Sequence, residues 1–171
     1  FLLKSLKERF RIDDSNIMGL SSDTILDFTS LNQIIDYNEF SELLPEYPSP
    51  IKSIDMEGDE DKNIFEILSD RDIFLHHPYN SFDPVIKFLN EAADDPDVLS
   101  IKITLYRTAK NSGVIDALLK AAENGKHVSV LFEVKARFDE ENNLRNGYKL
   151  EKAVCYVIYG IGSLKTHTKL L

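Results

Sequence analysis

The sequence has one cysteine, little glycine and no long apolar run, and these shortages exclude several classes of protein. Its 171 residues include one cysteine, seven glycines and no tryptophan. A lone Cys155 cannot build a disulfide framework within one chain, which excludes a disulfide-stabilised secreted scaffold. No run approaches the roughly 18 apolar residues of a membrane span, and the apolar start FLL is too short for a signal peptide. We therefore expect a cytoplasmic protein.

Several enzyme motifs are also missing from the sequence. It has no glycine-rich phosphate loop and no Cys-x-x-Cys pair. His76 and His77 are adjacent, so on an extended segment they point to opposite faces and cannot easily share one metal ion. Packing or capping by one of them, with the other lining a path for anions, is the favoured interpretation.

Charge is distributed unevenly along the chain, whose net charge is −9. Residues 1–70 carry 6 basic and 16 acidic side chains, whereas residues 71–171 carry 14 and 13. From Val98 onward, 12 basic side chains stand against 7 acidic ones. The overall charge argues against a nucleic-acid binder, and the local excess of cations predicts that polyanions are steered to the C-terminal part.

The organisation of the chain indicates two parts. Residues 1–70 read as a mainly helical segment that ends in a Pro-rich connector at 45–50 and an acidic stretch at 55–61. We place the domain boundary near Asp70. Residues 71–171 then form a second domain of a different class.

This second domain alternates apolar, β-branched runs with segments of helical periodicity. The predicted strands are 98–106, 127–134, 154–159 and a fourth that begins at 165, and the predicted helices are 83–93, 114–124 and 140–153. Strands that alternate with helices of this size predict an α/β fold, with a parallel-dominated sheet flanked by helices and joined by right-handed crossovers.

Chemistry-bearing residues follow three of these runs at intervals of thirty residues: Arg107, Arg137 and His167. Parallel strands deliver their carboxyl ends to one edge, where such sheets bind ligands. Lys169 shares a face with His167 on an extended segment, and Lys135 shares one with Arg137. A neutral imidazole can attack a phosphoryl group while an ammonium stabilises its oxygens, so the cluster predicts phosphoryl transfer. The H-x-K pair alone is short and also arises by chance.

Five blocks of sequence carry a resemblance to a known family. They are DIFLHHPYNSFDP (72–84), EAADDPDV (91–98), TLYRT (104–108), KARFDEE (135–141) and LKTHTKL (164–170). In order and spacing they resemble the long-chain polyphosphate kinases, whose catalytic half is phospholipase D-like. The first seventy residues resemble this family only loosely, as the end of its middle helical domain.

The resemblance implies reversible transfer of the terminal phosphate of ATP to inorganic polyphosphate through a phosphohistidine, with Mg²⁺. His167 falls on the phosphorylated histidine, and Arg107 and Arg137 fall on two positions that the family assigns to the Mg²⁺ site. Because a guanidinium has no lone pair for a metal, we interpret these arginines as holding phosphates that Mg²⁺ also bridges. Lys135 and Lys165 are expected as further phosphate contacts, Lys169 as a catalytic residue, and the full-length enzyme as a homo-oligomer.

The sequence also departs from the family. Val154 stands where relatives usually have a helix-ending glycine. A phospholipase D-like site is built from two H-x-K halves and only one is present, so we expect a piece of a longer enzyme that is inactive alone. Two alternatives remain open: a phospholipase D-like phosphodiesterase, which needs the longer H-x-K-x4-D motif, and a non-catalytic anion-binding module.

Overall fold

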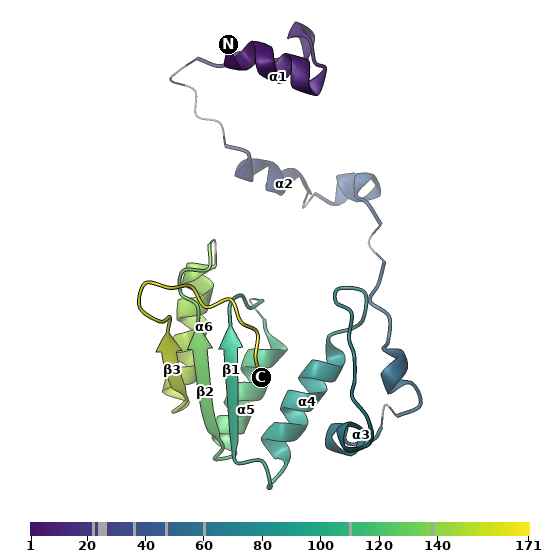
Figure 1. The fold of residues 1–171 in the computed structure, drawn as a ribbon, viewed down its shortest axis with the longest axis vertical. Coiled ribbons are helices and arrows are strands. Elements are labelled where there is room, and N and C mark those ends of the chain that lie inside the picture. The colour runs from purple at the N-terminus through teal and green to yellow at the C-terminus, as the bar shows by residue number, and fades with distance from the viewer. Residues whose placement is uncertain are drawn as a thin grey trace. The chain divides into compact units, whose positions relative to one another are not determined.

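The protein, seen here as a computed structural model, consists of two compact units. The structure describes residues 1–21, 23, 27–35, 37–46, 48–59, 61–109, 111–137 and 139–171. The units are Phe1–Tyr47 and Pro48–Leu171 (Figure 1). The chain passes from one to the other within the Pro-rich connector, and the family-level boundary near Asp70 stays a prediction.

The first unit is built from short helices, as the sequence predicts. Its α-helices are α1 (Leu2–Phe10) and α2 (Asn32–Ile35), and its 3₁₀ turns are Asp14–Asn16, Thr29–Leu31 and Asn38–Leu43. No residue of α1 is buried, and its apolar side chains, among them Leu2 and Phe10, are exposed.

The second unit contains a parallel three-stranded sheet in the order β1-β2-β3. Its strands are β1 (Ser100–Leu105), β2 (His127–Phe132) and β3 (Tyr156–Tyr159), and its long helices are α4 (Asp83–Asp94), α5 (Gly113–Glu123) and α6 (Glu140–Lys152). Each helix begins and ends within one residue of its predicted bounds. The predicted α/β fold with a parallel-dominated sheet is confirmed.

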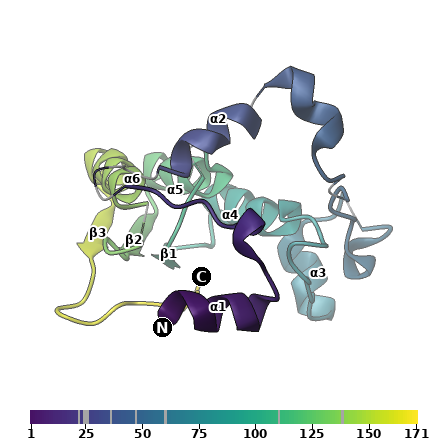
Figure 2. The ribbon, with the colours of Figure 1, turned by 90° about the horizontal axis from the view of Figure 1, so that it is seen from above.

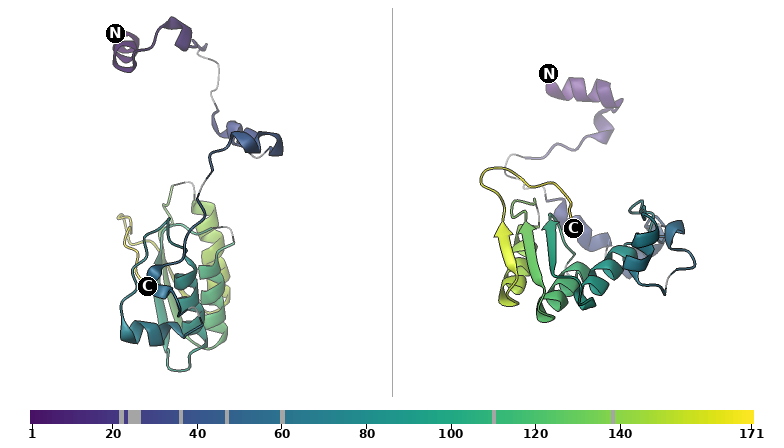
Figure 3. Two further views of the ribbon diagram at one scale, coloured as in Figure 1. Left: turned by 90° about the vertical axis from the view of Figure 1, so that its right-hand side faces the viewer. Right: turned by 60° about the horizontal axis from the view of Figure 1, so that its bottom comes forward.

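The long helices cover one face of this sheet (Figures 2 and 3). Side chains on that face, such as Val130 and Phe132, are fully buried against Leu118 of α5 and Leu150 of α6. On the opposite face Lys102 is exposed. The core is therefore one-sided, and it fixes the carboxyl ends of all three strands at the same edge.

Helix α6 reaches the sheet through a glycine and ends in a strained residue. A Cβ at Gly147 would lie 2.6 Å from Cε1 of Tyr159, so a glycine there lets the ring of β3 lie against the helix. After α6, Val154 adopts φ 64°, the left-handed conformation that usually ends a helix on glycine. The departure from the family pattern thus falls where the backbone favours glycine, and β3 begins at Tyr156, two residues later than predicted.

The segment before α4 folds against that helix. It contains a 3₁₀ turn, Ile54–Met56, and α3 (Ile64–Asp70), which bury Met56, Ile64 and Ile67 in a small cluster of their own. Asp59 of the acidic stretch pairs with Arg71. The acidic stretch belongs to the second unit, and this ion pair holds Asp59 in place within it.

One predicted strand is wrong. Residues 165–171 join no ladder among the described residues and run past the carboxyl end of β1 (Figure 1). Thr104 of β1 holds them instead: its N–H donates to Leu170 O at 3.0 Å and its hydroxyl donates to Thr168 O at 2.7 Å. Across the described part of the chain, no helix is both long and apolar enough to cross a membrane.

Candidate active site

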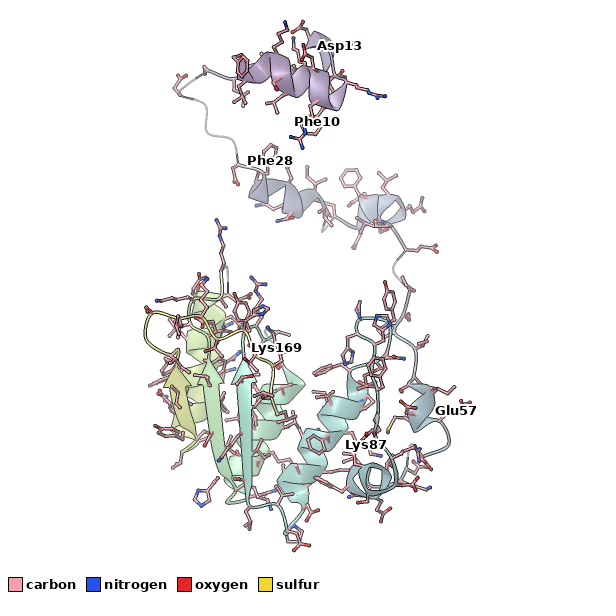
Figure 4. The ribbon with its side chains drawn as sticks, viewed as in Figure 1. Phe10, Asp13, Phe28, Glu57, Lys87 and Lys169 are labelled. Atoms are coloured by element: carbon pink, nitrogen blue, oxygen red, sulfur yellow. The ribbon has the colours of Figure 1, made fainter. Side chains whose placement is uncertain are left out.

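The predicted site residues gather at the carboxyl edge of the sheet. Arg107 follows β1, Arg137 lies on the loop between β2 and α6, and the segment with His167 and Lys169 crosses this edge. Nη2 of Arg107 donates to the carbonyl of Arg137 at 2.9 Å. Figure 4 shows Lys169 beside the end of β1. The structure thus brings these residues together, and their roles stay predictions.

A tyrosine ring lies at the centre of this cluster. The rings of Tyr106 and His167 have centroids 5.1 Å apart at 81°, an edge-to-face contact. Nζ of Lys169 lies 4.9 Å from the centroid of the Tyr106 ring, and Cζ of Arg107 lies 5.4 Å from it. Because the π face of a ring attracts cations, Tyr106 can fix both cationic side chains relative to His167. It is not among the site residues predicted from the sequence.

A cavity of about 860 Å³ opens beside this ring. Arg107, His167 and Lys169 line one part of it, and apolar side chains such as Ile86 and Leu89 of α4 line another. The polar part offers two cations and one nucleophilic imidazole, which is a chemistry suited to a phosphoryl group.

The other predicted phosphate contacts lie outside the lining of this cavity, on neighbouring loops. Nζ of Lys165 donates to the carbonyl of Lys135 at 2.9 Å, which joins the segment before His167 to the loop after β2. Ala136 is fully buried between the exposed Lys135 and Arg137. The alternation predicted for these two cations is therefore present, although no strand continues through them.

An ion pair fixes the Arg107 guanidinium. Its Nε lies 2.6 Å from Oδ2 of Asp139, and its Nη2 is held by the Arg137 carbonyl. A planar group held at two of its five N–H positions has a defined orientation. Sequence reasoning missed Asp139, although this carboxylate lies in the KARFDEE block two residues after Arg137.

A second carboxylate, Glu133, lies beneath the cluster. It is 1% exposed, and its oxygens accept the backbone N–H groups of Lys135 at 2.9 Å and Thr166 at 2.6 Å. The Thr166 N–H is the largest cause that lowers the pKa of Glu133; burial opposes it, while the Lys135 N–H and the ammonium groups of Lys165 and Lys135 add to the lowering. Sequence reasoning missed Glu133 because the predicted strand ran to Val134, so Glu133 was counted as a strand residue and not as part of a loop at the site.

Helix α6 bonds both the loop after β1 and the loop after β2. Nδ2 of the buried Asn143 donates to Tyr106 O at 2.8 Å and to Glu133 O at 3.1 Å. Nδ2 of Asn142 donates to Thr108 O at 2.6 Å. The helix therefore fixes the residues on either side of Arg107 to the end of β2.

The described residues do not form a metal site by themselves. No group of three or more His, Cys, Asp or Glu side chains among them could hold a metal ion. Arg107 and Arg137 offer no lone pair, and Asp139 is already engaged by Arg107. The residues that the structure describes therefore do not fit a Mg²⁺ ion held by protein ligands alone.

Comparisons with known proteins match this part of the chain. The family model described as polyphosphate kinase C-terminal domain 1 matches residues 63–171. The chain is 46% identical over 169 residues to a polyphosphate kinase of Staphylococcus epidermidis, covering 96% of this chain and 22% of that protein. It is 48% identical over 176 residues to one of Halalkalibacterium halodurans, covering 99% of this chain and 24% of that protein.

A solved structure agrees with the sequence matches. The crystal structure of polyphosphate kinase from Porphyromonas gingivalis is similar with a TM-score of 0.64 and 36% identity, covering 93% of this chain and 26% of that one. The chain thus spans about a quarter of the length of these relatives.

Proposed function

The chain belongs to the polyphosphate kinase family, and we propose that it carries the nucleophilic half of an active site that transfers the terminal phosphate of ATP to polyphosphate. His167 is the proposed nucleophile. Arg107 and Lys169 stabilise the transferred group, and Arg137, Lys135 and Lys165 contact the phosphates of the substrates.

In the proposed reaction a ring nitrogen of neutral His167 attacks the γ-phosphorus of ATP. The N–P bond forms as the bond from phosphorus to the bridging oxygen breaks, and ADP leaves. A terminal oxygen of polyphosphate then attacks the same phosphorus, which breaks the N–P bond and frees the imidazole. Each step is reversible, because either leaving group can return as the nucleophile.

The observation that carries this proposal is the common cavity of Arg107, His167 and Lys169 around Tyr106. Two cations beside one imidazole suit a group that carries several negative oxygens throughout its transfer. Membership of the polyphosphate kinase family favours this proposal over a phosphodiesterase. Labelling of His167 separates it from a non-catalytic anion-binding module, which the same cations would also suit.

The proposal extends to the metal and to the setting of the enzyme. Because the described residues do not fit a protein-held ion, we expect Mg²⁺ to reach the site on the phosphates of ATP, with Arg107 and Arg137 contacting those phosphates. The acidic net charge accords with the absence of a nucleic-acid partner, and Cys155, buried as a free thiol, accords with a cytoplasmic setting. The homo-oligomer stays an expectation from the family resemblance.

Labelling with γ-³²P ATP tests the proposal in the full-length protein. We expect acid-labile, base-stable label on His167, and none there in His167→Ala. The matched control is His127→Ala, which removes an exposed imidazole at the start of β2, the opposite end of the strand. Label on serine or aspartate in the wild type, or undiminished label in His167→Ala, would refute the phosphohistidine.

The arginines are tested in the same assay. The double variant Arg107→Ala with Arg137→Ala should lose label transfer, because it removes both guanidinium groups next to the cavity. Lys149→Ala, which removes an exposed cation of α6, serves as the control. Normal labelling in the double variant would contradict the assigned roles.

A further inference from the structure

We infer that Glu133 is a positioning residue for His167, holding the segment that carries the nucleophile in register with the loop that carries Arg137. The inference rests on the proposed function for its catalytic consequence. Its structural content, the bond from Glu133 to the residue before His167, can be tested without any activity.

The contacts of Glu133 join three segments that are far apart in sequence. Its own N–H donates to Leu105 O at the end of β1 at 2.9 Å. Its Oε1 accepts from Lys135 N, two residues before Arg137, and its Oε2 accepts from Thr166 N, one residue before His167. Glu133 therefore bonds the end of β1, the loop with Arg137 and the segment with His167.

The histidine segment depends on this carboxylate because it has no sheet ladder of its own in the described structure. Its backbone is held at one end by Glu133 and at the other by Thr104, which bonds Thr168 and Leu170. His167 lies between these two attachments. Loss of the first leaves the N-terminal side of His167 joined to the loop after β2 through the Lys165 side chain, which donates to Lys135 O.

A carboxylate is the suitable group for this position. Both partners are N–H donors, and an ionised carboxylate is an acceptor at both oxygens. Glutamine has the same shape, but its NH₂ group would face one of the two N–H donors. Glu133→Gln therefore removes one of the two hydrogen bonds with little change in side-chain volume. The N–H group that loses its acceptor is left buried and unpaired, which is costly.

The first test needs no variant. Hydrogen exchange with single-residue resolution on the full-length wild-type protein should show the Thr166 amide protected by about 100-fold relative to an unstructured amide, although it lies outside any ladder. Rapid exchange of Thr166 would overturn the inference, whether or not His167 is phosphorylated.

The second test compares Glu133→Gln with Glu123→Gln, which changes an exposed carboxylate at the end of α5. In the first variant alone, we expect faster exchange of whichever amide then faces the NH₂ group, Thr166 or Lys135. At saturating ATP the rate of label transfer to His167 should fall by roughly 100-fold, the cost of a misplacement of about 1 Å, with nucleotide affinity within about threefold of the wild type.

The outcomes separate this inference from the proposed function. Unchanged exchange of both Thr166 and Lys135 in Glu133→Gln, unchanged labelling of His167, or a loss of nucleotide affinity as large as the loss of labelling rate would each overturn the positioning role. Absence of label on wild-type His167 would overturn the proposed function instead. In that case the exchange of Thr166 still decides whether Glu133 holds this segment.

Discussion

Replacing Tyr106 by leucine should impair the proposed site, although Tyr106 is neither the proposed nucleophile nor a proposed phosphate contact. The ring makes one edge-to-face contact with His167 and faces two cations, Lys169 and Arg107. Exposed cation–π contacts contribute about 0.5–1 kcal/mol each and an aromatic pair about 0.5–1.5 kcal/mol. The three contacts together are worth about 1.5–3.5 kcal/mol, an upper bound because contacts that share one ring do not add.

The expected effect follows from this range. At about 1.4 kcal/mol for each tenfold, Tyr106→Leu should slow the labelling of His167 by roughly 10- to 300-fold. Tyr106→Phe keeps the ring and should stay within about twofold of the wild type. Both variants keep the backbone carbonyl that accepts from Asn143, so the loop itself is retained. Single-turnover labelling measures the rates.

Two results would refute this reasoning. If Tyr106→Leu labels His167 at the wild-type rate, the ring does not orient the cluster. If Tyr106→Phe loses as much as Tyr106→Leu, the hydroxyl group and not the ring is responsible.

Two further predictions concern stability. Val154→Gly should raise the free energy of unfolding by up to about 1.5 kcal/mol, because the left-handed conformation costs a side chain about 1–2 kcal/mol and glycine loses about 0.5–1 kcal/mol more backbone entropy. The Val154 side chain is 93% exposed, so little burial is lost. A lower midpoint in urea than that of the wild type would contradict this prediction. Folding lowers the pKa of Glu133, so its contribution is complete above the ordinary glutamate value of about 4.3 and is lost as the pH falls through the lower folded value. The stability difference between wild type and Glu133→Gln should therefore shrink between about pH 6 and about pH 3, and a difference that stays constant over this range would contradict the assignment.

The helices and the order of strands could be predicted from the sequence because their signals are local. Asp83 and Pro84 mark the start of α4, and apolar residues at helical spacing define α5. Strand ends are less local. The run after His127 is β-branched and largely apolar through Val134, yet β2 stops at Phe132, and the buried Glu133 that follows accepts from Lys135 and Thr166.

Residues of the candidate site could be predicted from the sequence only where the residue type and its own place in the chain indicate the chemistry. Arg107, Arg137 and His167 stand out because each follows an apolar run at equal spacing. The contacts that orient them are long-range: Arg107 pairs with Asp139, and Glu133 bonds Thr166 thirty-three residues later. The periodicity of the sequence does not predict which carboxylate is buried, because this depends on the contacts that distant loops make in the folded protein.

Residues 165–171, which carry His167, were predicted as a strand, and their actual structure changes how the nucleophile is positioned. In a ladder its backbone N–H groups would bond a neighbouring strand, and the alternation of a flat strand would set its side chains. Here side-chain oxygens of Glu133 and Thr104 accept the N–H groups of Thr166 and Leu170 instead. Between these attachments His167 and Lys169 both reach the ring of Tyr106. Since the segment joins no ladder among the described residues, the placement of the nucleophile depends on these acceptors and on the side-chain contacts of Lys165 and Tyr106. A change at Glu133 or at the Thr104 hydroxyl should therefore act on His167 before it acts on the sheet.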